Sequence, residues 1–193
     1  MATRQRAGAE IRERILEATL DEVAARGEAV TLQAVAARAD VALRTLYNHF
    51  AGREDLLTAA FLHHAAQTRA AVEAVTLPDA PPAEKLRHVV AAYHARYARM
   101  GDRLSALLSL RGFPELDEQI HLIRGQRHQR MSEIVACAEQ AGQLKLPAPT
   151  VVTLAYTLTG HATWQTLLEH VDGDPAEATR VATEALRSAL FHR

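Results

Sequence analysis

Apolar residues recur at intervals of three and four along almost the whole 193-residue chain, and this spacing gathers them on one face of a helix. No stretch shows the alternation of apolar and polar residues that a half-buried strand requires. Alanine, which favours helix more than any other residue, is abundant throughout. The sequence therefore predicts an all-α fold, in which glycine, proline and capping residues mark the ends of the helices.

These punctuating residues divide the chain into segments. Gly27 stands where a C-terminal cap belongs, Thr31 is a candidate N-cap, and Asp174 precedes Pro175 at a first helical position. Residues 77–82 form the one Pro-rich break between the segments. The expected helices span about 9–26, 31–39, 41–50, 53–75, 83–100, 103–111, a long segment that ends near 141, 150–171 and 175–191.

Residues 31–50 read TLQAVAARADVALRTLYNHF and contain two short apolar-periodic runs. A helix of about two turns is unstable alone, because nucleation costs more than its few hydrogen bonds return. The two runs and the preceding helix can share one three-helix core: Ile15, Val23, Leu32, Val35, Ala36, Val41, Leu46 and Phe50. Apart from Leu46, the side chains between 43 and 49 are then not required for the core. A short exposed helix braced in this way has the size and shape to enter a DNA major groove.

Composition limits the class of protein. The chain is 48% hydrophobic and 23% charged, so it can bury a sizeable core. It has no apolar run long enough to span a membrane and no secretory signal at its start, and its single cysteine fits a reducing compartment, so the expected location is the cytoplasm. The formal net charge of −1 requires any basic surface for DNA to be local.

The first part of the chain resembles the DNA-binding region of the TetR family of transcriptional regulators. The resemblance covers about the first 57 residues and rests on many matched positions: Ile15, Leu16, Ala18, Gly27, Thr31, Val35, Ala36, Ala39, Val41, Thr45, Leu46, Tyr47, His49, Phe50, Leu56 and Leu57. It implies a helix-turn-helix DNA-binding domain over 1–52 and a larger helical ligand-binding and dimerisation domain over 53–193. Four residues depart from the family pattern, which usually has phenylalanine, a turn glycine, a capping serine and lysine at these places: Val23, Asp40, Ala42 and Arg53.

The resemblance also implies how single residues meet DNA. Thr31 caps its helix and can contact a phosphate, and Arg53 holds another phosphate together with the amides at the start of its helix. Arg4 and Arg6 lie either in an arm that follows the DNA or in a merely solvated terminus. The full set of candidate DNA-binding residues is Arg4, Arg6, Thr31, Leu43, Arg44, Thr45, Tyr47, Asn48, His49 and Arg53. The implied function is a repressor, not an enzyme and without a cofactor, that a small ligand releases from a palindromic operator.

The candidate ligand-binding residues combine apolar bulk with a few polar rings: Phe61, His64, Tyr93, Tyr97, Leu107, Phe113, His121, Tyr156, His161 and Trp164. Small-molecule sites usually have this character, although the same residues can simply fill a core. Because no carboxylate stands out among them, we expect a mainly apolar ligand with an acceptor or a mild negative charge. His121 and His161 can donate hydrogen bonds to it, and Arg111 or Arg124 can pair with it if either points inward.

The histidines and the cysteine favour no metal or redox site. The pairs His63–His64, His121–His128 and His161–His170 lack the one-turn spacing with an acidic partner that defines a helical zinc motif. Cys137 shares a helical stripe with Ile134, Ala138 and Ala141, so we expect it in the core rather than at a redox sensor.

Small residues recur at turn spacing in the last two expected helices: Ala155, Thr159, Ala162, Ala178, Ala182, Ala185 and Ala189. They allow helices to approach closely, either across a two-fold homodimer through 150–191 or within one subunit. The competing classes are an all-helical ligand carrier or enzyme that does not bind DNA, and a bundle that only mediates interactions. The chain lacks a nucleophile elbow, a glycine-rich phosphate loop and a carboxylate–histidine motif, which disfavours an enzyme.

Overall fold

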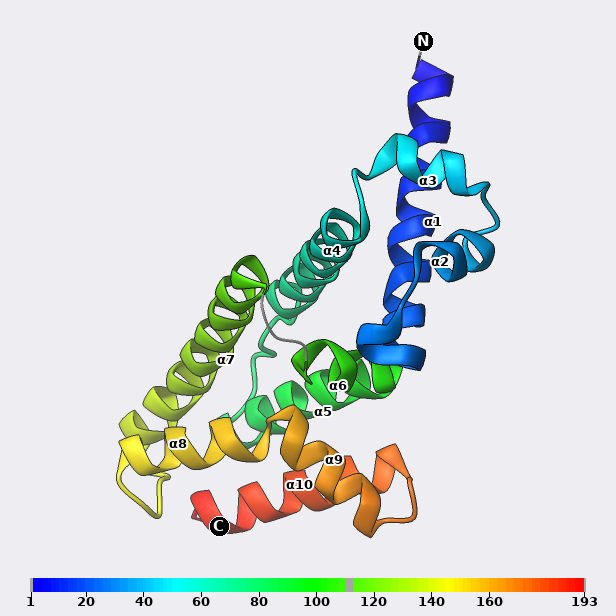
Figure 1. Ribbon diagram of the computed structural model, residues 1–193. Coiled ribbons are helices and arrows are strands. Elements are labelled where there is room, and N and C mark those ends of the chain that lie inside the picture. The colour runs from blue at the N-terminus through cyan, green and yellow to red at the C-terminus, as the bar shows by residue number, and fades with distance from the viewer. Residues whose placement is uncertain (1, 110–112, 193) are drawn as a thin grey trace. The chain divides into compact units, whose positions relative to one another are not determined.

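The computed structural model describes residues 2–109 and 113–192, and its regular elements are helices (Figure 1). In chain order these elements are α1 (Ala2–Arg26), the 3₁₀ helix η1 (Gly27–Ala29), α2 (Leu32–Arg38), α3 (Leu43–His49), α4 (Arg53–Glu73), α5 (Pro82–Met100), α6 (Asp102–Ser109), α7 (Pro114–Gln140), α8 (Ala148–Leu158), α9 (His161–His170) and α10 (Pro175–Leu190). The predicted all-α fold is confirmed. None of the described helices is long and apolar enough to cross a bilayer.

Two helix boundaries differ from the sequence prediction. Helix α1 begins at Ala2, so Arg4 and Arg6 belong to a helix and not to an extended arm. The expected helix over 150–171 is two helices, because Thr159 turns its hydroxyl back to the Ala155 carbonyl at 2.7 Å and Gly160 is extended. A Cβ at residue 160 would lie 3.1 Å from the Thr157 carbonyl oxygen, so glycine suits this tight break. Arg111, named as a possible ligand partner, lies outside the described residues.

The chain forms two compact units. Unit 1 consists of Met1–Thr68 and Gly101–His121, and unit 2 consists of Arg69–Met100 and Leu122–Arg193. Helices α4 and α7 contribute residues to both units. This division follows packing, and the functional boundary at residues 52 and 53 stays a prediction.

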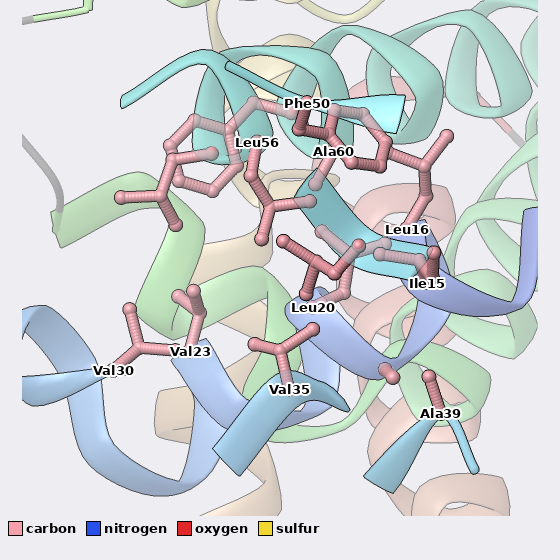
Figure 2. Close-up of a cluster of buried hydrophobic side chains, with 14 of the residues drawn as sticks. Ile15, Leu16, Leu20, Val23, Val30, Val35, Ala39, Phe50, Leu56 and Ala60 are labelled. Carbon is pink, nitrogen blue, oxygen red and sulfur yellow. The ribbon is translucent and has the colours of Figure 1, made fainter. Parts of the chain in front are cut away.

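The core of unit 1 joins α1, α2, α3 and α4. Side chains from these helices pack around Ile15, Val35 and Leu46, which are 0% exposed, and Figure 2 shows Phe50 beside Leu56 and Ala60 of α4. The predicted three-helix core is therefore present, and α4 completes it. A unit with so few residues in its helix-turn-helix part buries little apolar area by itself, which explains why α4 and α6 are needed.

Ion pairs fasten other helices of unit 1 to α1. Glu22 of α1 is buried, and its two carboxylate oxygens lie 2.6 Å from Arg38 Nε and 2.7 Å from Arg26 Nε. Arg103 of α6 donates to Asp21 at 2.7 Å and to Glu17 at 2.9 Å. Because a buried carboxylate without partners costs several kcal/mol, the pair with Arg38 fixes α2 against α1.

Unit 2 packs α5, α8, α9 and α10 together, with the second half of α7. Helix α10 buries one stripe of residues, Ala178, Ala182, Leu186 and Leu190. Its start is capped as predicted, because Asp174 accepts from the amides of Ala176 and Glu177 at 2.8 and 3.3 Å.

The expectation that Cys137 is a core residue is wrong. The buried stripe of α7 consists of Met131, Ile134, Val135 and Ala138, and Cys137 is exposed. Adjacent residues of a helix point about 100° apart, so Cys137 falls beside the stripe and not on it.

Candidate functional site

Helices α2 and α3 are joined by a tight turn whose geometry follows from local sequence. Thr31 Oγ1 accepts from the Ala34 amide at 3.2 Å and caps α2 as predicted. The amides of Asp40 and Val41 donate to the carbonyls of Ala37 and Ala36 at 3.3 and 3.0 Å, which is the Schellman pattern at a helix end. Asp40 has a φ of 52°, a left-handed conformation that aspartate tolerates better than most residues. Asp40 thus adopts the left-handed conformation for which glycine is usually used.

The N-terminus of α3 has no side-chain cap. Ala42 occupies the N-cap position with extended backbone, and a methyl group cannot accept a hydrogen bond. Relative to serine at this position, alanine costs about 1 kcal/mol. Packing in the core of unit 1 therefore carries more of the stability of α3.

Helix α3 has one buried face and one exposed face. Leu46 is 0% exposed and Phe50, which follows the helix, is 3% exposed, whereas Tyr47 is 51% exposed. Arg44 and Asn48 share the exposure of Tyr47, while Leu43, Thr45 and His49 are half-buried at the margins. The structure thus presents a row of hydrogen-bonding side chains on a short helix that is anchored from behind.

The start of α4 is a less simple anion site than the sequence indicated. Arg53 is exposed, and its Nε donates to the Val30 carbonyl at 3.1 Å. The Ala51 amide already donates to the Asp55 carboxylate at 2.8 Å, and Glu54 and Asp55 occupy the first turn. Two carboxylates oppose a phosphate at this helix end, so a phosphate contact here depends on the Arg53 side chain rather than on backbone amides.

One further arginine lies beside α3 and was missed in the sequence. The Arg12 guanidinium carbon lies 5.1 Å from the centre of the Phe50 ring, and Arg12 is exposed. Arg6 is also exposed, and the Arg4 side chain lies outside the described residues. Arg12 lies on helix α1 together with Arg4 and Arg6. The recurrence of arginine at residues 4, 6 and 12 was the sequence feature that could have indicated it.

The candidate ligand-binding residues fall into two groups. Phe61, Leu107 and Phe113 pack in the core of unit 1, where the rings of Phe61 and Phe113 meet edge to face at 4.9 Å. His64 is half-buried and His121 is exposed, both in unit 1, and Arg124 of unit 2 is exposed too. The other five candidates belong to unit 2: Tyr93, Tyr97, Tyr156, His161 and Trp164. The structure therefore does not gather the set within one unit.

Four aromatic rings of unit 2 form a cluster, which we call the aromatic cluster: His94, Tyr97, His161 and Trp164. The Tyr97 ring centre lies 5.2 Å from that of His161 and 5.8 Å from that of Trp164. All four residues are buried. Their burial raises the pKa of Tyr97 and lowers that of His161. His94, at 1% exposed, was missed because one histidine in a helical repeat carries no distinct signal.

Arg127 of α7 reaches this cluster and was also missed. Its Nη1 donates to Tyr97 Oη at 3.3 Å and to the Thr159 carbonyl at 3.4 Å. Its guanidinium carbon lies 4.1 Å from the centre of the Tyr156 ring. A Cβ at Gly160 would lie 3.5 Å from Nη1, so the glycine leaves room for the guanidinium.

We expect His94 to make the protein less stable as the pH falls from about 6.5 to 4. Burial lowers the pKa of His94 from 6.5 to about 4, so across this range the unfolded chain binds a proton that the folded chain does not. The contribution of neutral His94 to the free energy of unfolding is complete above pH 6.5. It falls as the pH is lowered, and the loss reaches about 2–3 kcal/mol at pH 4. Denaturant unfolding of the protein and of His94→Gln at pH 7 and pH 4.5 measures it, because every other group titrates in both. An equal loss in the two proteins would contradict a neutral, buried His94.

The turn between two short helices, the exposed face of α3 and the shared core define a helix-turn-helix protein. Residues 15–60 match the family model described as bacterial regulatory proteins, tetR family. The helix-turn-helix region of the chain is therefore of the TetR type.

Two relatives support this assignment over part of the chain. The HTH-type transcriptional repressors KstR of Mycolicibacterium smegmatis and Mycobacterium tuberculosis are 40% and 39% identical over 83 residues. This match covers 42% of this chain and 40% and 37% of those proteins. The matched region thus spans less than half of these relatives.

Solved structures extend the similarity to the whole fold. A regulatory protein in the tetR family from Rhodococcus RHA1 is 25% identical, with a TM-score of 0.73 over 95% of this chain and 98% of that chain. The regulator FadR from Bacillus subtilis, solved in complex with stearoyl-CoA, is 21% identical, with a TM-score of 0.66 over 91% of this chain and 97% of that chain. The fold of both units is therefore the TetR fold.

Proposed function

We propose that the protein is a DNA-binding transcriptional repressor that leaves a palindromic operator when a small, mainly apolar ligand binds. The observation that carries this proposal is the exposed face of α3: Tyr47 is 51% exposed while Leu46, its neighbour in sequence, is 0% exposed. A large exposed aromatic residue on a helix fixed from behind is suited to contact another molecule. Its neighbours Arg44 and Asn48 carry the donors that base edges and phosphates accept.

Most of the candidate residues have a proposed role on the DNA. Arg44 and Thr45 lie in or beside the major groove, Tyr47 and His49 contact the sugar–phosphate backbone, and Thr31 contacts a phosphate at the start of α2. Arg53 holds a further phosphate through its side chain. Arg12 adds positive charge beside α3, and Arg4 and Arg6 belong to the same helix; a local basic surface of this kind compensates for a net charge of −1 over the whole chain.

The similarity to TetR-family regulators supports the proposed repression and the proposed lack of catalysis. Both KstR relatives are named repressors, which favours repression over activation here, and regulators of this family are generally not enzymes. The protein would act in the cytoplasm, where it meets DNA. The alternative is an all-helical ligand carrier or enzyme that does not bind DNA.

A two-fold homodimer through residues 150–191 completes the proposal, because a palindromic operator is read by a two-fold protein. Part of the small-residue stripe is used inside the subunit: Ala155, Thr159, Ala178 and Ala182 are buried. Ala162, Ala185 and Ala189 are exposed and stay available to a partner. Light scattering at micromolar concentration should give twice the 21.1 kDa of one chain, and a monomer would refute this part.

The proposed release mechanism uses α4, whose residues run from the core of unit 1 into unit 2. A ligand that shifts α4 changes the spacing of the two DNA-binding heads of the dimer. Half-sites lie about 34 Å apart on one face of the duplex, so heads fitted to that spacing tolerate little change.

We expect DNA affinity to fall steeply as salt increases. Each phosphate neutralised by arginine contributes roughly 0.9 to the slope of log affinity against log salt concentration. Arg6, Arg12, Arg44 and Arg53 are exposed, and the four on each of two subunits predict a slope of about −7. Gel shifts with the DNA that flanks its own gene, over a series of salt concentrations, measure this slope. A flat response would refute the proposed phosphate contacts.

A further inference from the structure

The aromatic cluster of unit 2 contains buried polar atoms that make no hydrogen bond. Within the described residues, Trp164 Nε1, His161 Nε2, His94 Nε2 and Arg127 Nε are all inaccessible to solvent and lack a partner. Trp164, His161 and His94 are 4%, 9% and 1% exposed. An unsatisfied buried polar group costs about 1–3 kcal/mol; the aromatic cluster holds three of them, and Arg127, which reaches the cluster, holds a fourth. A concentration of this kind in one place points to a bound molecule.

The hydrogen-bonding role of His94 can be deduced. The single hydroxyl hydrogen of Thr179 is donated to the Pro175 carbonyl at 2.8 Å, so Thr179 Oγ1 accepts from His94 Nδ1 at 3.1 Å. A neutral imidazole with its hydrogen on Nδ1 has a lone pair on Nε2. The unpartnered Nε2 of His94 is therefore an acceptor, whereas Arg127 Nε and Trp164 Nε1 are donors.

Arg127 makes the cluster electrically positive. The described residues provide it with hydrogen bonds to a tyrosine hydroxyl and a carbonyl, and none of the ion pairs among them involves Arg127. A half-buried guanidinium among aromatic rings is costly without a counter-charge. Arginine N–H groups bind carboxylates with charge-assisted hydrogen bonds.

We propose that the aromatic cluster binds a small apolar carboxylic acid, as its carboxylate, that also carries a hydroxyl group. Arg127 Nε and Trp164 Nε1 donate to the carboxylate, the hydroxyl donates to His94 Nε2, and the rings of Tyr97 and His161 contact the apolar body. This assignment names the ligand class of the proposed repressor, and in that respect it rests on the proposed function. The binding itself involves unit 2 and is measured without DNA.

Benzoate and hexanoate are the probes, with benzamide and benzylamine as neutral and cationic matches for benzoate. Trp164 is the only tryptophan in the chain, so a change in its emission reports binding at the cluster, and calorimetry gives the affinity. We expect at least one carboxylate to bind and to change the Trp164 emission at concentrations up to about 10 mM, and benzamide and benzylamine to bind at least tenfold more weakly. No response to either carboxylate, or equal affinity for benzamide, would overturn the proposal.

Arg127→Gln tests whether the positive charge of Arg127 binds the carboxylate. Arg124→Gln is its matched control, because Arg124 lies three residues earlier on α7 and is exposed. We expect Arg127→Gln to weaken carboxylate binding at least tenfold and Arg124→Gln to leave it unchanged. Trp164→Phe, followed by calorimetry, removes one donor while keeping an aromatic ring, and it should also weaken binding. If Arg127→Gln fails to fold, Trp164→Phe decides. Full affinity in Trp164→Phe, or in a folded Arg127→Gln, would contradict the site.

The hydroxyl group is tested separately with the three isomers of hydroxybenzoate. At least one isomer should bind more tightly than benzoate, and His94→Leu should remove that advantage while benzoate still binds. If no isomer gains affinity, the role of His94 is wrong.

A carboxylate that binds through Arg127 but leaves the DNA complex intact would refute the proposed release and keep the site. Release by uncharged apolar compounds alone would keep the proposed function and refute this ligand class.

Discussion

Tyr47→Ala should abolish specific DNA binding and leave the protein as stable as before. The side chain is 51% exposed, so its loss removes little buried area, and surface substitutions usually change the free energy of unfolding by less than about 0.5 kcal/mol. Its phenol, in contrast, stands on the exposed face of α3 where we place the DNA backbone. Gel shifts measure the loss of binding, and denaturant unfolding measures the unchanged stability.

Phe50→Ala is the matched control, because it removes an aromatic ring only three residues away. Phe50 is 3% exposed and packs among residues of α1 and α4. Its truncation should cost about 3–5 kcal/mol and unfold the DNA-binding head. Arg12 also loses the ring over which its guanidinium lies. If Tyr47→Ala and Phe50→Ala unfolded at the same denaturant concentration, the division of α3 into an exposed and a buried face would be wrong.

Operator DNA should weaken effector binding by the same factor by which the effector weakens DNA binding. This equality is a thermodynamic necessity for two ligands that favour different states of one protein. A coupling free energy of about 3 kcal/mol lowers operator affinity by more than a hundredfold. A thermal-shift screen identifies ligands, and each is then titrated against the protein with and without operator.

Equal ligand affinities in the two titrations would show that the ligand and the operator are not coupled. The protein would then be a DNA binder without this switch. Unequal factors in the two directions would mean that one titration had not reached equilibrium, because the binding cycle must close. A shuffled DNA of the same length is the control, because it should leave ligand affinity unchanged.

The DNA-binding head was largely predictable because local sequence determines it. The cap at Thr31 and the turn at Asp40 require particular residues at particular places, and Leu46 and Phe50 keep helical spacing over a short distance. The side-chain bonds of Arg38 and Arg103 were not predictable, because their carboxylate partners on α1 are 16 to 86 residues away. Periodicity indicates which face is apolar but not which charged residues meet.

The aromatic cluster was only partly predictable for the same reason. Tyr97, His161 and Trp164 were expected near a ligand because of their chemistry, but the approach of Arg127 depends on the helix break at Gly160. The sequence pattern continues through this break, so one helix over 150–171 was the natural expectation. Phe61 belongs to unit 1 and Trp164 to unit 2. This assignment depends on how the helices pack into units, and the spacing of residues within one helix does not encode it.

The most direct test of DNA recognition by α3 is fluorescence anisotropy with two labelled duplexes at one fixed salt concentration. One duplex contains the DNA that flanks the protein's own gene, and the other is a shuffled sequence of the same composition. Specific complexes are typically at least about a thousandfold tighter than non-specific ones. We expect a preference of that order for the flanking DNA, lost in Tyr47→Ala. Equal affinity for both duplexes, or an unchanged preference in Tyr47→Ala, would contradict recognition through this helix.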